Sequence, residues 1–241
     1  MSRRPTIGAM ILAAGRGERM RPLSDATPKP LLEAGGKALL RWQIEALARA
    51  GFRDIVINVA HFPDQFIAAF GDGAALGVKL AWSVERKALE AAGGIRTALA
   101  LLPAGPLLIV SGDIHTGYDY ASLRPRAEAM AKVATVPRVH LVMVSNPAYH
   151  PGGDFALADG RIDAAGSTRL TYANIGLYDS TLFGELPRGV KLKLLPYLER
   201  WIAGGRVSGE HFDGPWTNVG TPADLATLDR MLRDRASDRP A

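Results

Sequence analysis

Short apolar runs alternate with amphipathic stretches through the first half of the chain. Apolar runs bounded by turn residues predict strands, and apolar residues three or four positions apart predict helices. The predicted strands cover residues 7–13, 55–59, 78–84 and 106–110, and the predicted helices cover residues 39–50, 62–70 and 93–102. This alternation is typical of an α/β protein whose parallel sheet carries helices on both faces.

The second half is less regular and contains more turn residues. Strands are predicted at 141–144 and 170–178, a helix at 192–203, and an Asp-Gly turn within each of 155–162 and 207–219. Of the two, Asp159-Gly160 predicts a hairpin. Thr221-Pro222-Ala223-Asp224 predicts the start of a helix that runs to about Asp234. We therefore expect both halves to share one sheet, with the second supplying a lid or substrate-binding subregion.

Composition narrows the classes of partner. The 241 residues have a net charge of +5 and include no cysteine. Disulfides and thiolate metal sites are therefore excluded, and the positive balance favours anionic partners. No basic stretch is interleaved with aromatic residues, which disfavours nucleic acid. We expect neither a signal peptide nor a membrane-spanning segment, and therefore a cytoplasmic protein without membrane contact.

The first predicted strand runs into a loop of small residues that contains several cations. Its sequence is Ala13-Ala14-Gly15-Arg16-Gly17-Glu18-Arg19-Met20-Arg21. Glycines allow close approach of the backbone to an anion, and consecutive N–H groups can cradle phosphates. The third glycine of a dinucleotide fingerprint and the Gly-Lys-Ser/Thr of a Walker A loop are both missing. The loop alone leaves a phosphate cradle and a plain connection equally open.

Two further residues favour the phosphate site. Lys29 lies between Pro28 and Pro30, which predicts extended geometry and a side chain aimed at a fixed anion. Asp113 follows the strand at 106–110, whereas the glycine loop follows the first strand. Ligands of such sheets bind outside the carboxyl ends of the strands. We therefore expect the loop and Asp113 on the same rim.

The order of these motifs resembles a known family. The chain resembles the sugar-1-phosphate nucleotidylyltransferases at five segments of their signature. These segments are residues 12–23, 28–32 and 36–39, then Ser111-Gly112-Asp113 and Trp216-Thr217-Asn218-Val219-Gly220-Thr221. The resemblance implies a Rossmann-like three-layer α/β/α fold with a mixed, mostly parallel central sheet. It implies one domain over residues 1–241, without a C-terminal β-helix. Residues up to about 115 would form the nucleotide-binding half, and residues from about 116 the sugar-binding half.

The family's reaction transfers a nucleotidyl group from a nucleoside triphosphate to a sugar 1-phosphate, with Mg²⁺, and releases pyrophosphate. By resemblance, Arg16 would hold the triphosphate and Lys29 would neutralise the attacking sugar phosphate. Asp113 and Asn218 would be the metal ligands, although many relatives have aspartate at the second position. The attacking group is already an anion, so alignment and charge neutralisation suffice without a general base.

The same resemblance implies two sets of binding residues. The nucleotide would contact Leu12, Ala13, Ala14, Gly15, Gly17, Glu90 and Gly93. The sugar would contact Asn146, Asp154, Asn174 and Lys193. The small molecules would be the partners of a monomer or homodimer.

The final third discriminates between substrates. Residues 207–212, leading into 216–221, resemble the uridylyltransferases that act on N-acetylmuramate 1-phosphate in cell-wall recycling. That resemblance favours UTP and N-acetylmuramate 1-phosphate. Asn174 and the pair Ala91-Ala92 depart from this subgroup. Mannose-1-phosphate guanylyltransferase, or another hexose- or heptose-1-phosphate nucleotidyltransferase, therefore stays open.

A function from another class is a nucleotide-sugar-binding regulator without turnover. The presence of Arg16, Lys29 and Asp113 together argues against it, since binding alone does not require all three.

Overall fold

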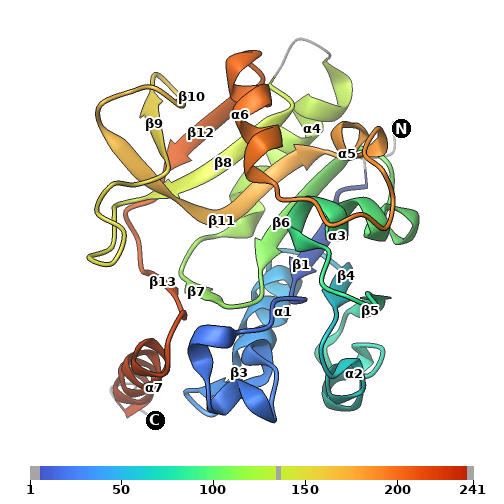
Figure 1. Ribbon diagram of the computed structural model, residues 1–241, viewed down its shortest axis with the longest axis vertical. Helices are drawn as coiled ribbons and strands as arrows, with labels where there is room; N and C mark the ends of the chain where they lie inside the picture. Colours follow the sequence, from blue (N-terminus) through green and yellow to red (C-terminus); the bar gives the residue numbers. More distant parts are fainter. Residues whose placement is uncertain (1–5, 134–136, 238–241) are drawn as a thin grey trace.

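The computed structural model describes residues 6–133 and 137–237. These residues are built around one nine-stranded sheet (Figure 1). Its strand order is β5-β4-β1-β6-β11-β8-β12-β10-β9. The strands are β1 (Gly8–Leu12), β4 (Asp54–Val59), β5 (Lys79–Val84), β6 (Pro106–Ser111), β8 (Val139–Val144), β9 (Phe155–Ala158), β10 (Arg161–Asp163), β11 (Arg169–Asp179) and β12 (Val207–His211). Two small ribbons pair β2 (Glu33–Ala34) with β3 (Lys37–Ala38), and β7 (Ile114–Thr116) with β13 (Trp216–Asn218).

The main sheet is mixed, as the resemblance implies. β5, β4, β1 and β6 run parallel to one another, which fits the helical crossovers between them. β11 lies between β6 and β8 and is antiparallel to both. The parallel pairing of β8 with β12 and the hairpin β9–β10 complete the sheet. The strands of both halves therefore belong to one continuous sheet.

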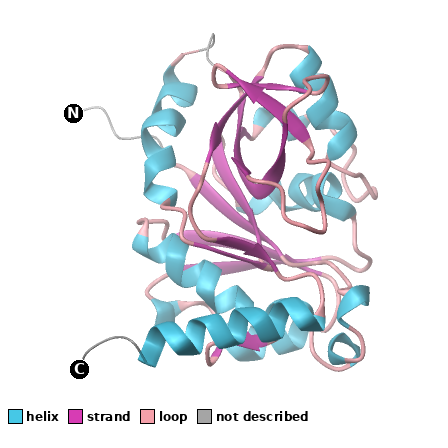
Figure 2. Cartoon of the chain, turned by 90° about the vertical axis from the view of Figure 1, so that its left-hand side faces the viewer, coloured by secondary structure: helices cyan, strands magenta, loops and turns pink. Residues whose placement is uncertain are grey.

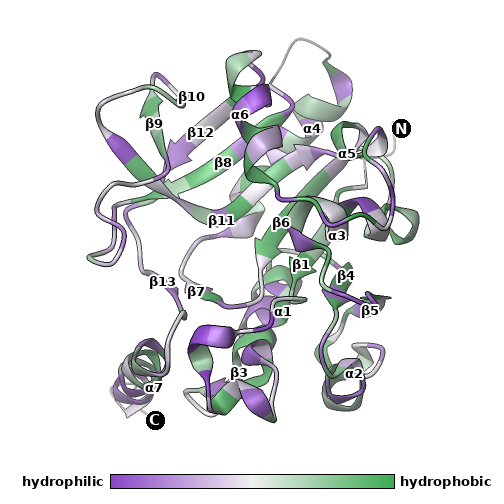
Figure 3. Cartoon of the chain, in the orientation of Figure 1, coloured by the Kyte–Doolittle hydropathy of each residue, from purple (hydrophilic) through white to green (hydrophobic). Residues whose placement is uncertain are grey.

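Helices pack against both faces of this sheet (Figure 2). The helices of the described residues are α1 (Leu39–Arg49), α2 (Pro63–Phe70), α3 (Glu90–Ala98), α4 (Arg124–Lys132), α5 (Thr181–Gly184), α6 (Leu195–Ala203) and α7 (Pro222–Ser237), of which α7 packs away from the main sheet. Successive strand residues point to opposite faces. Ile11 accordingly belongs to the cluster that contains Ile44 of α1, whereas Met10 belongs to the cluster that contains Ile95 of α3 and Trp201 of α6. The central strands β6 and β8 are hydrophobic along most of their length (Figure 3).

The second half contains most of the differences from the sequence prediction. The Asp159-Gly160 hairpin is confirmed, since Ala158 pairs with Arg161. Asp213-Gly214 does not close a hairpin, because β12 joins the main sheet and β13 pairs with β7. The pattern also gave no sign of α4 or β7. Only Ala127 and Met130 of α4 are buried, which is too few apolar positions for a visible helical period.

The C-terminal helix begins as predicted. Thr221 and Asp224 form a capping box, in which the Thr221 Oγ1 accepts from the Asp224 N–H at 3.2 Å. The Asp224 Oδ2 accepts in return from the Thr221 N–H at 2.8 Å. These bonds satisfy N–H groups that a helix start leaves unpaired. Within the described residues the helix extends to Ser237, slightly beyond the predicted Asp234.

The helix α7 packs onto the segment that follows the glycine loop. Leu228 of α7 is buried in a cluster with Met20 and Leu39. Asp229 accepts a hydrogen bond from the backbone N–H of Gly35 at 2.8 Å. The C-terminal helix is therefore in direct contact with residues 20–39, although the two ends of the described chain lie far apart (Figure 1). None of the helices in the described residues is both long and apolar enough to cross a membrane.

Candidate active site

The glycine loop leaves the sheet between two neighbouring strand ends. Leu12, at the end of β1, is in register with Asn58 on β4 and with Ser111 on β6. Residues 13–17 then follow without regular secondary structure. Gly17 has a φ of 62°, in the left-handed region that glycine adopts at little cost. The loop and the end of β6 thus share one rim, as the sequence predicts.

Two cavities adjoin at this rim. The larger, of about 1030 Å³, is lined by parts of the glycine loop and by residues 86–91. The smaller, of about 550 Å³, is lined mainly by residues from the second half of the chain. Leu12, Ala91 and Ser111 line both. A shared wall of this kind suits a reaction between two substrates that are bound side by side.

Lys29 and Asp113 form an ion pair beside the larger cavity. The Lys29 Nζ lies 2.5 Å from the Asp113 Oδ2, and the two side chains are 12% and 26% exposed. The predicted extended geometry at Lys29 is wrong, because Lys29 to Leu31 form a short 3-10 turn. Pro30 is tolerated there because the first turn of a helix does not need its N–H. The turn nevertheless places the ammonium group against Asp113.

Asn218 is brought to Asp113 by the β7–β13 ribbon. Asn218 is paired with Ile114, the residue after Asp113, and the Val219 N–H donates to the Asp113 carbonyl oxygen at 2.9 Å. Among the described residues, no hydrogen-bond partner is found for the buried Asn218 Oδ1. Buried polar oxygens are normally paired, so this oxygen retains the capacity to accept a hydrogen bond or to coordinate an ion. A carboxylate and an amide oxygen fit the hard-oxygen preference of Mg²⁺.

A metal ion held there would depend on few protein ligands. Within residues 6–133 and 137–237, no group of three or more His, Cys, Asp or Glu side chains is arranged to hold a metal ion. Magnesium commonly takes one or two carboxylates and completes its shell with water and substrate phosphates. The pair Asp113 and Asn218 therefore fits an ion that is bound together with a phosphate-bearing ligand.

Three cationic or titratable side chains surround the glycine loop. Arg16 lines the larger cavity, and it also lines a small one of about 330 Å³ together with Arg19 and Lys29. Arg19 also lines the cavity of about 550 Å³, together with Asn218. His61 faces the larger cavity, and burial together with the nearby Arg16 lowers its pKa. The loop therefore presents positive charge to both cavities, whereas its imidazole neighbour favours the neutral form.

The predicted nucleotide contacts are distributed unevenly. Leu12, Ala14 and Gly15 line the larger cavity. The Ala13 N–H is already bonded to the Asn58 Oδ1 at 3.0 Å. A Cβ on Gly17 would lie 2.9 Å from the Lys29 Cβ, so this glycine allows the loop to approach Lys29.

Glu90 and Gly93 lie at the start of α3. Glu90 lines the larger cavity, has a φ of 61°, and lies 3.5 Å from the Lys191 Nζ. A Cβ on Gly93 would lie 2.2 Å from the Val190 carbonyl oxygen. Glycine is therefore required where residues 190–192 cross the helix. Gly93 contributes to the cavity by allowing this close packing and not by contacting a ligand with a side chain.

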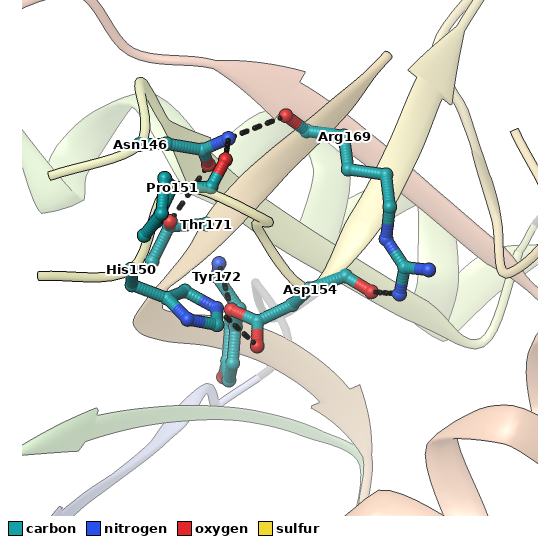
Figure 4. A network of polar contacts seen from close by, with 7 residues as sticks. All are labelled: Asn146, His150, Pro151, Asp154, Arg169, Thr171 and Tyr172. Carbon is teal, nitrogen blue, oxygen red and sulfur yellow. Dashed lines mark hydrogen bonds and ion pairs between the residues drawn. The ribbon is translucent and has the colours of Figure 1, made fainter. Parts of the chain in front are cut away.

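The predicted sugar residues separate into two groups. Asp154 and Asn174 line the smaller cavity. Asn146 instead uses its amide internally (Figure 4), since its Nδ2 donates to the carbonyl oxygens of Pro151 and Arg169 and its Oδ1 accepts from the Thr171 Oγ1. Asn146 therefore fixes the loop that ends at Asp154. Lys193 is exposed beside Leu194 and Leu195, which line the smaller cavity.

Asp154 is itself oriented by hydrogen bonds. Its Oδ2 accepts from the Tyr172 N–H at 2.8 Å, and its Oδ1 lies 3.2 Å from the His150 Nε2 (Figure 4). Asn174, at the irregularity between Tyr172 and Gly176 where β11 pairs with β8, has a φ of 58°. Asn tolerates this region better than most residues, so the backbone there turns an amide side chain toward the cavity.

Several residues that line the cavities were absent from the predicted site. They include Arg19, Tyr149, Trp216, Asn58 and His61. Tyr149 and Trp216 come from loop and ribbon segments whose approach depends on tertiary contacts. Asn58 did leave a signal in the sequence, because it is a polar residue inside the apolar run of β4.

With the site defined, comparison with known proteins identifies the class. Residues 8–147 match the family model described as nucleotidyl transferase, and the chain belongs to that family. It is 44% identical over 221 residues to the N-acetylmuramate alpha-1-phosphate uridylyltransferase of Neisseria meningitidis serogroup B, an alignment that covers 90% of this chain and 94% of that protein. It is 37% identical over 242 residues to the protein of the same name from Caulobacter vibrioides, with 96% and 99% covered.

A solved structure supports the fold. A Bacillus anthracis protein described as a glucose-1-phosphate thymidylyltransferase, crystallised with sucrose, superposes with a TM-score of 0.80 at 22% identity. The superposition covers 95% of this chain and 96% of that chain. At this identity the likeness supports the fold alone.

Proposed function

We propose that this chain transfers the uridylyl group of UTP to N-acetylmuramate α-1-phosphate and releases pyrophosphate. The observation that carries the reaction class is the grouping of Lys29, Asp113 and the unpaired Asn218 oxygen beside two adjoining cavities. The choice of substrates is supported by the two curated relatives, which align over nearly the whole chain. The glycine-loop half would bind the nucleotide and the remainder the sugar, within a three-layer domain.

The proposed step is a displacement at the α-phosphorus. An oxygen of the sugar phosphate forms a bond to the α-phosphorus, and the bond from that phosphorus to the bridging oxygen of the β-phosphate breaks. Lys29 would neutralise the incoming phosphate, while Arg16 would stabilise charge on the departing pyrophosphate. Two anions must approach each other, so charge neutralisation and alignment provide most of the acceleration.

Asp113 and Asn218 would hold a magnesium ion. Magnesium, when bound, neutralises phosphate charge and aligns phosphate oxygens. The Lys29 ammonium now paired with Asp113 would turn to the phosphates as they enter. The carboxylate is thereby released for the ion, which couples substrate binding to assembly of the site.

The sugar would occupy the smaller cavity. Asp154 and Asn174 provide polar atoms at its wall, whereas Leu195 and Leu198 of α6 provide apolar surface. A cavity with both kinds of lining suits a sugar with an apolar substituent beside its hydroxyl groups. The lactyl and acetamido groups of N-acetylmuramate each present a methyl group beside polar atoms, which in the lactyl group are those of a carboxylate.

A matrix of nucleoside triphosphates against sugar 1-phosphates tests the proposal. We expect pyrophosphate release with Mg²⁺, UTP and N-acetylmuramate 1-phosphate to exceed release with GTP and mannose 1-phosphate by about 10²-fold in kcat/KM. The second pair is the principal alternative, motivated by Asn174 and Ala91-Ala92. Faster turnover with GTP and mannose 1-phosphate would replace our assignment. Tight nucleotide binding without release from any pair would instead indicate a regulator.

Asn218 offers a test of the metal site. Changing Asn218 to aspartate adds a second carboxylate, so we expect the Mg²⁺ concentration for half-maximal activity to fall about tenfold. A magnesium titration of pyrophosphate release measures this value. Asp159, at the tip of the β9–β10 hairpin, offers Asp159→Asn as a control for a change of one surface charge. An unaltered titration in Asn218→Asp would show that Asn218 does not contact the ion.

We further propose that the protein works in the cytoplasm, where its two phosphorylated substrates would be available, as a monomer or homodimer. Its composition, without cysteine, is compatible with a reducing compartment. In that setting the product would serve the recycling of cell-wall sugar.

A further inference from the structure

We propose that Asn58 and Glu85 are positioning residues that hold the two walls of the nucleotide cavity at a fixed separation. The inference rests on the proposed function in assigning the larger cavity to the nucleotide. Neither side chain is a candidate catalytic group in that proposal. Their role follows from a chain of hydrogen bonds that crosses the sheet edge beneath the cavity.

The chain of bonds joins three segments. The Ala13 N–H of the glycine loop donates to the Asn58 Oδ1 at 3.0 Å, and the Asn58 Nδ2 donates to the Glu85 Oε1 at 2.7 Å. The Leu89 N–H then donates to the Glu85 Oε2 at 2.8 Å. Ala13 directly precedes the loop residues of one wall, and Leu89 belongs to the other wall. The walls are therefore tied through two side chains.

Burial makes this tie energetically significant. Asn58 is 2% exposed and Glu85 is 4% exposed. Burial also raises the pKa of the Glu85 carboxyl. A buried carboxylate is unfavourable unless it is well hydrogen-bonded, and no salt-bridge partner of Glu85 occurs among the described residues. A hydrophobic pair would fill the same space, so packing alone does not account for these two polar residues.

The start of α3 is built to accommodate the pair. A Cβ on Gly94 would lie 2.6 Å from the Asn58 Nδ2 and 2.8 Å from the Glu85 Oε1. Glycine inside a helix is less favourable than alanine by about 1 kcal/mol. Its presence at this position therefore lets the helix approach the Asn58–Glu85 pair closely.

The tie continues to a third wall segment. The Leu192 N–H donates to the Leu89 carbonyl oxygen at 2.9 Å, and the Gly93 N–H donates to the Leu192 carbonyl oxygen at 3.2 Å. Residues 189 and 191 line the same cavity. The Asn58–Glu85 pair thus stands at the centre of a connected frame around the nucleotide.

The donor and acceptor roles in these hydrogen bonds allow a test in which the carboxylate and the amide are exchanged between positions 58 and 85. Asn58 must accept from Ala13 and donate to Glu85, whereas Glu85 must accept at both oxygens. In Glu85→Gln, one buried donor always faces another donor. In Asn58→Asp, two carboxyl groups meet within hydrogen-bond distance. The double variant Asn58→Asp/Glu85→Gln restores all three bonds, because the introduced amide donates to the introduced carboxylate and accepts from the Leu89 N–H. The number of carboxylates is also unchanged.

The experiment measures UTP binding by calorimetry in the absence of sugar phosphate, and then both KM values. We expect each single variant to raise the Kd and KM for UTP by about tenfold, with the KM for the sugar phosphate changed less than about twofold. The double variant should return the UTP values to within about twofold of wild type. Glu33→Gln, an exposed change on β2, is the matched control and should have no effect.

The outcomes are distinguishable. If the wild-type protein does not bind UTP, the proposed function is overturned. If the wild-type protein binds UTP but the double variant binds it no better than the single variants do, the positioning role is overturned. If the single variants do not fold, the double variant alone decides, since its loss of UTP affinity contradicts the tie. Gly94→Ala should weaken UTP binding as well, and Gly184→Ala on α5, where a Cβ meets open space, should not.

Discussion

Changing Asp113 to asparagine is expected to lower kcat for nucleotidyl transfer by about 10²- to 10³-fold. Asp113 supplies the carboxylate of the proposed metal pair, and it also holds the Lys29 ammonium at 2.5 Å. The change keeps the size of the side chain but removes its charge. The site would then hold magnesium weakly, and Lys29 would lose its ionic partner.

Initial rates of pyrophosphate release across a magnesium titration measure this effect. Asp159→Asn again serves as the control, since it removes one carboxylate from the tip of the β9–β10 hairpin and not from the candidate site. Thermal unfolding of both variants should remain close to wild type, which separates loss of chemistry from loss of folding. Turnover that survives in Asp113→Asn would remove Asp113 from the site.

Changing Arg16 to alanine is expected to lower kcat by about 10²-fold and to raise the KM for the triphosphate. Arg16 lines the proposed nucleotide cavity and the small cavity that it shares with Lys29. In the proposed reaction its guanidinium would bind the β- and γ-phosphates and the pyrophosphate that they become. Because Arg16 does not line the proposed sugar cavity, the KM for the sugar phosphate should stay within about twofold.

Arg21→Ala is the matched control for this variant. Arg21 belongs to the same loop segment, but its side chain is 63% exposed and pairs with Asp25 at 3.1 Å on the surface. Surface ion pairs of this kind contribute little to stability. Steady-state kinetics with each substrate varied in turn should separate the two arginines. Equal effects of the two changes would mean that net charge, and not the place of Arg16, governs catalysis.

Sequence periodicity predicted the first half of the fold well. The strands β1, β4 and β6 are buried along nearly all of their length, which makes their sequences short apolar runs. The positions of the glycine loop and Asp113 on one rim followed from the direction of parallel strands. The contact between Lys29 and Asp113 then places the lysine on that rim as well.

The second half could not be predicted in the same way. The ribbon of β7 and β13 has only three residues in each strand, too few to show a period. Asn146 illustrates a further limit, because its amide is consumed by the backbone of Pro151 and Arg169. Whether a polar side chain faces a ligand or its own loop depends on distant segments. Resemblance to a family can point to such a residue, but it does not show whether the side chain contacts a ligand or the backbone of its own loop.

Because β7 pairs with β13, the proposed site combines residues that are synthesised early with residues that are synthesised late. Arg16, Lys29 and Asp113 emerge from the ribosome early, but Asn218 and the helix α7, which packs on Met20 and Leu39, emerge much later. The proposed metal pair of Asp113 and Asn218 can therefore be completed only after most of the chain has been synthesised. A message cut short before the codon for Asn218 would encode a chain without the second proposed ligand.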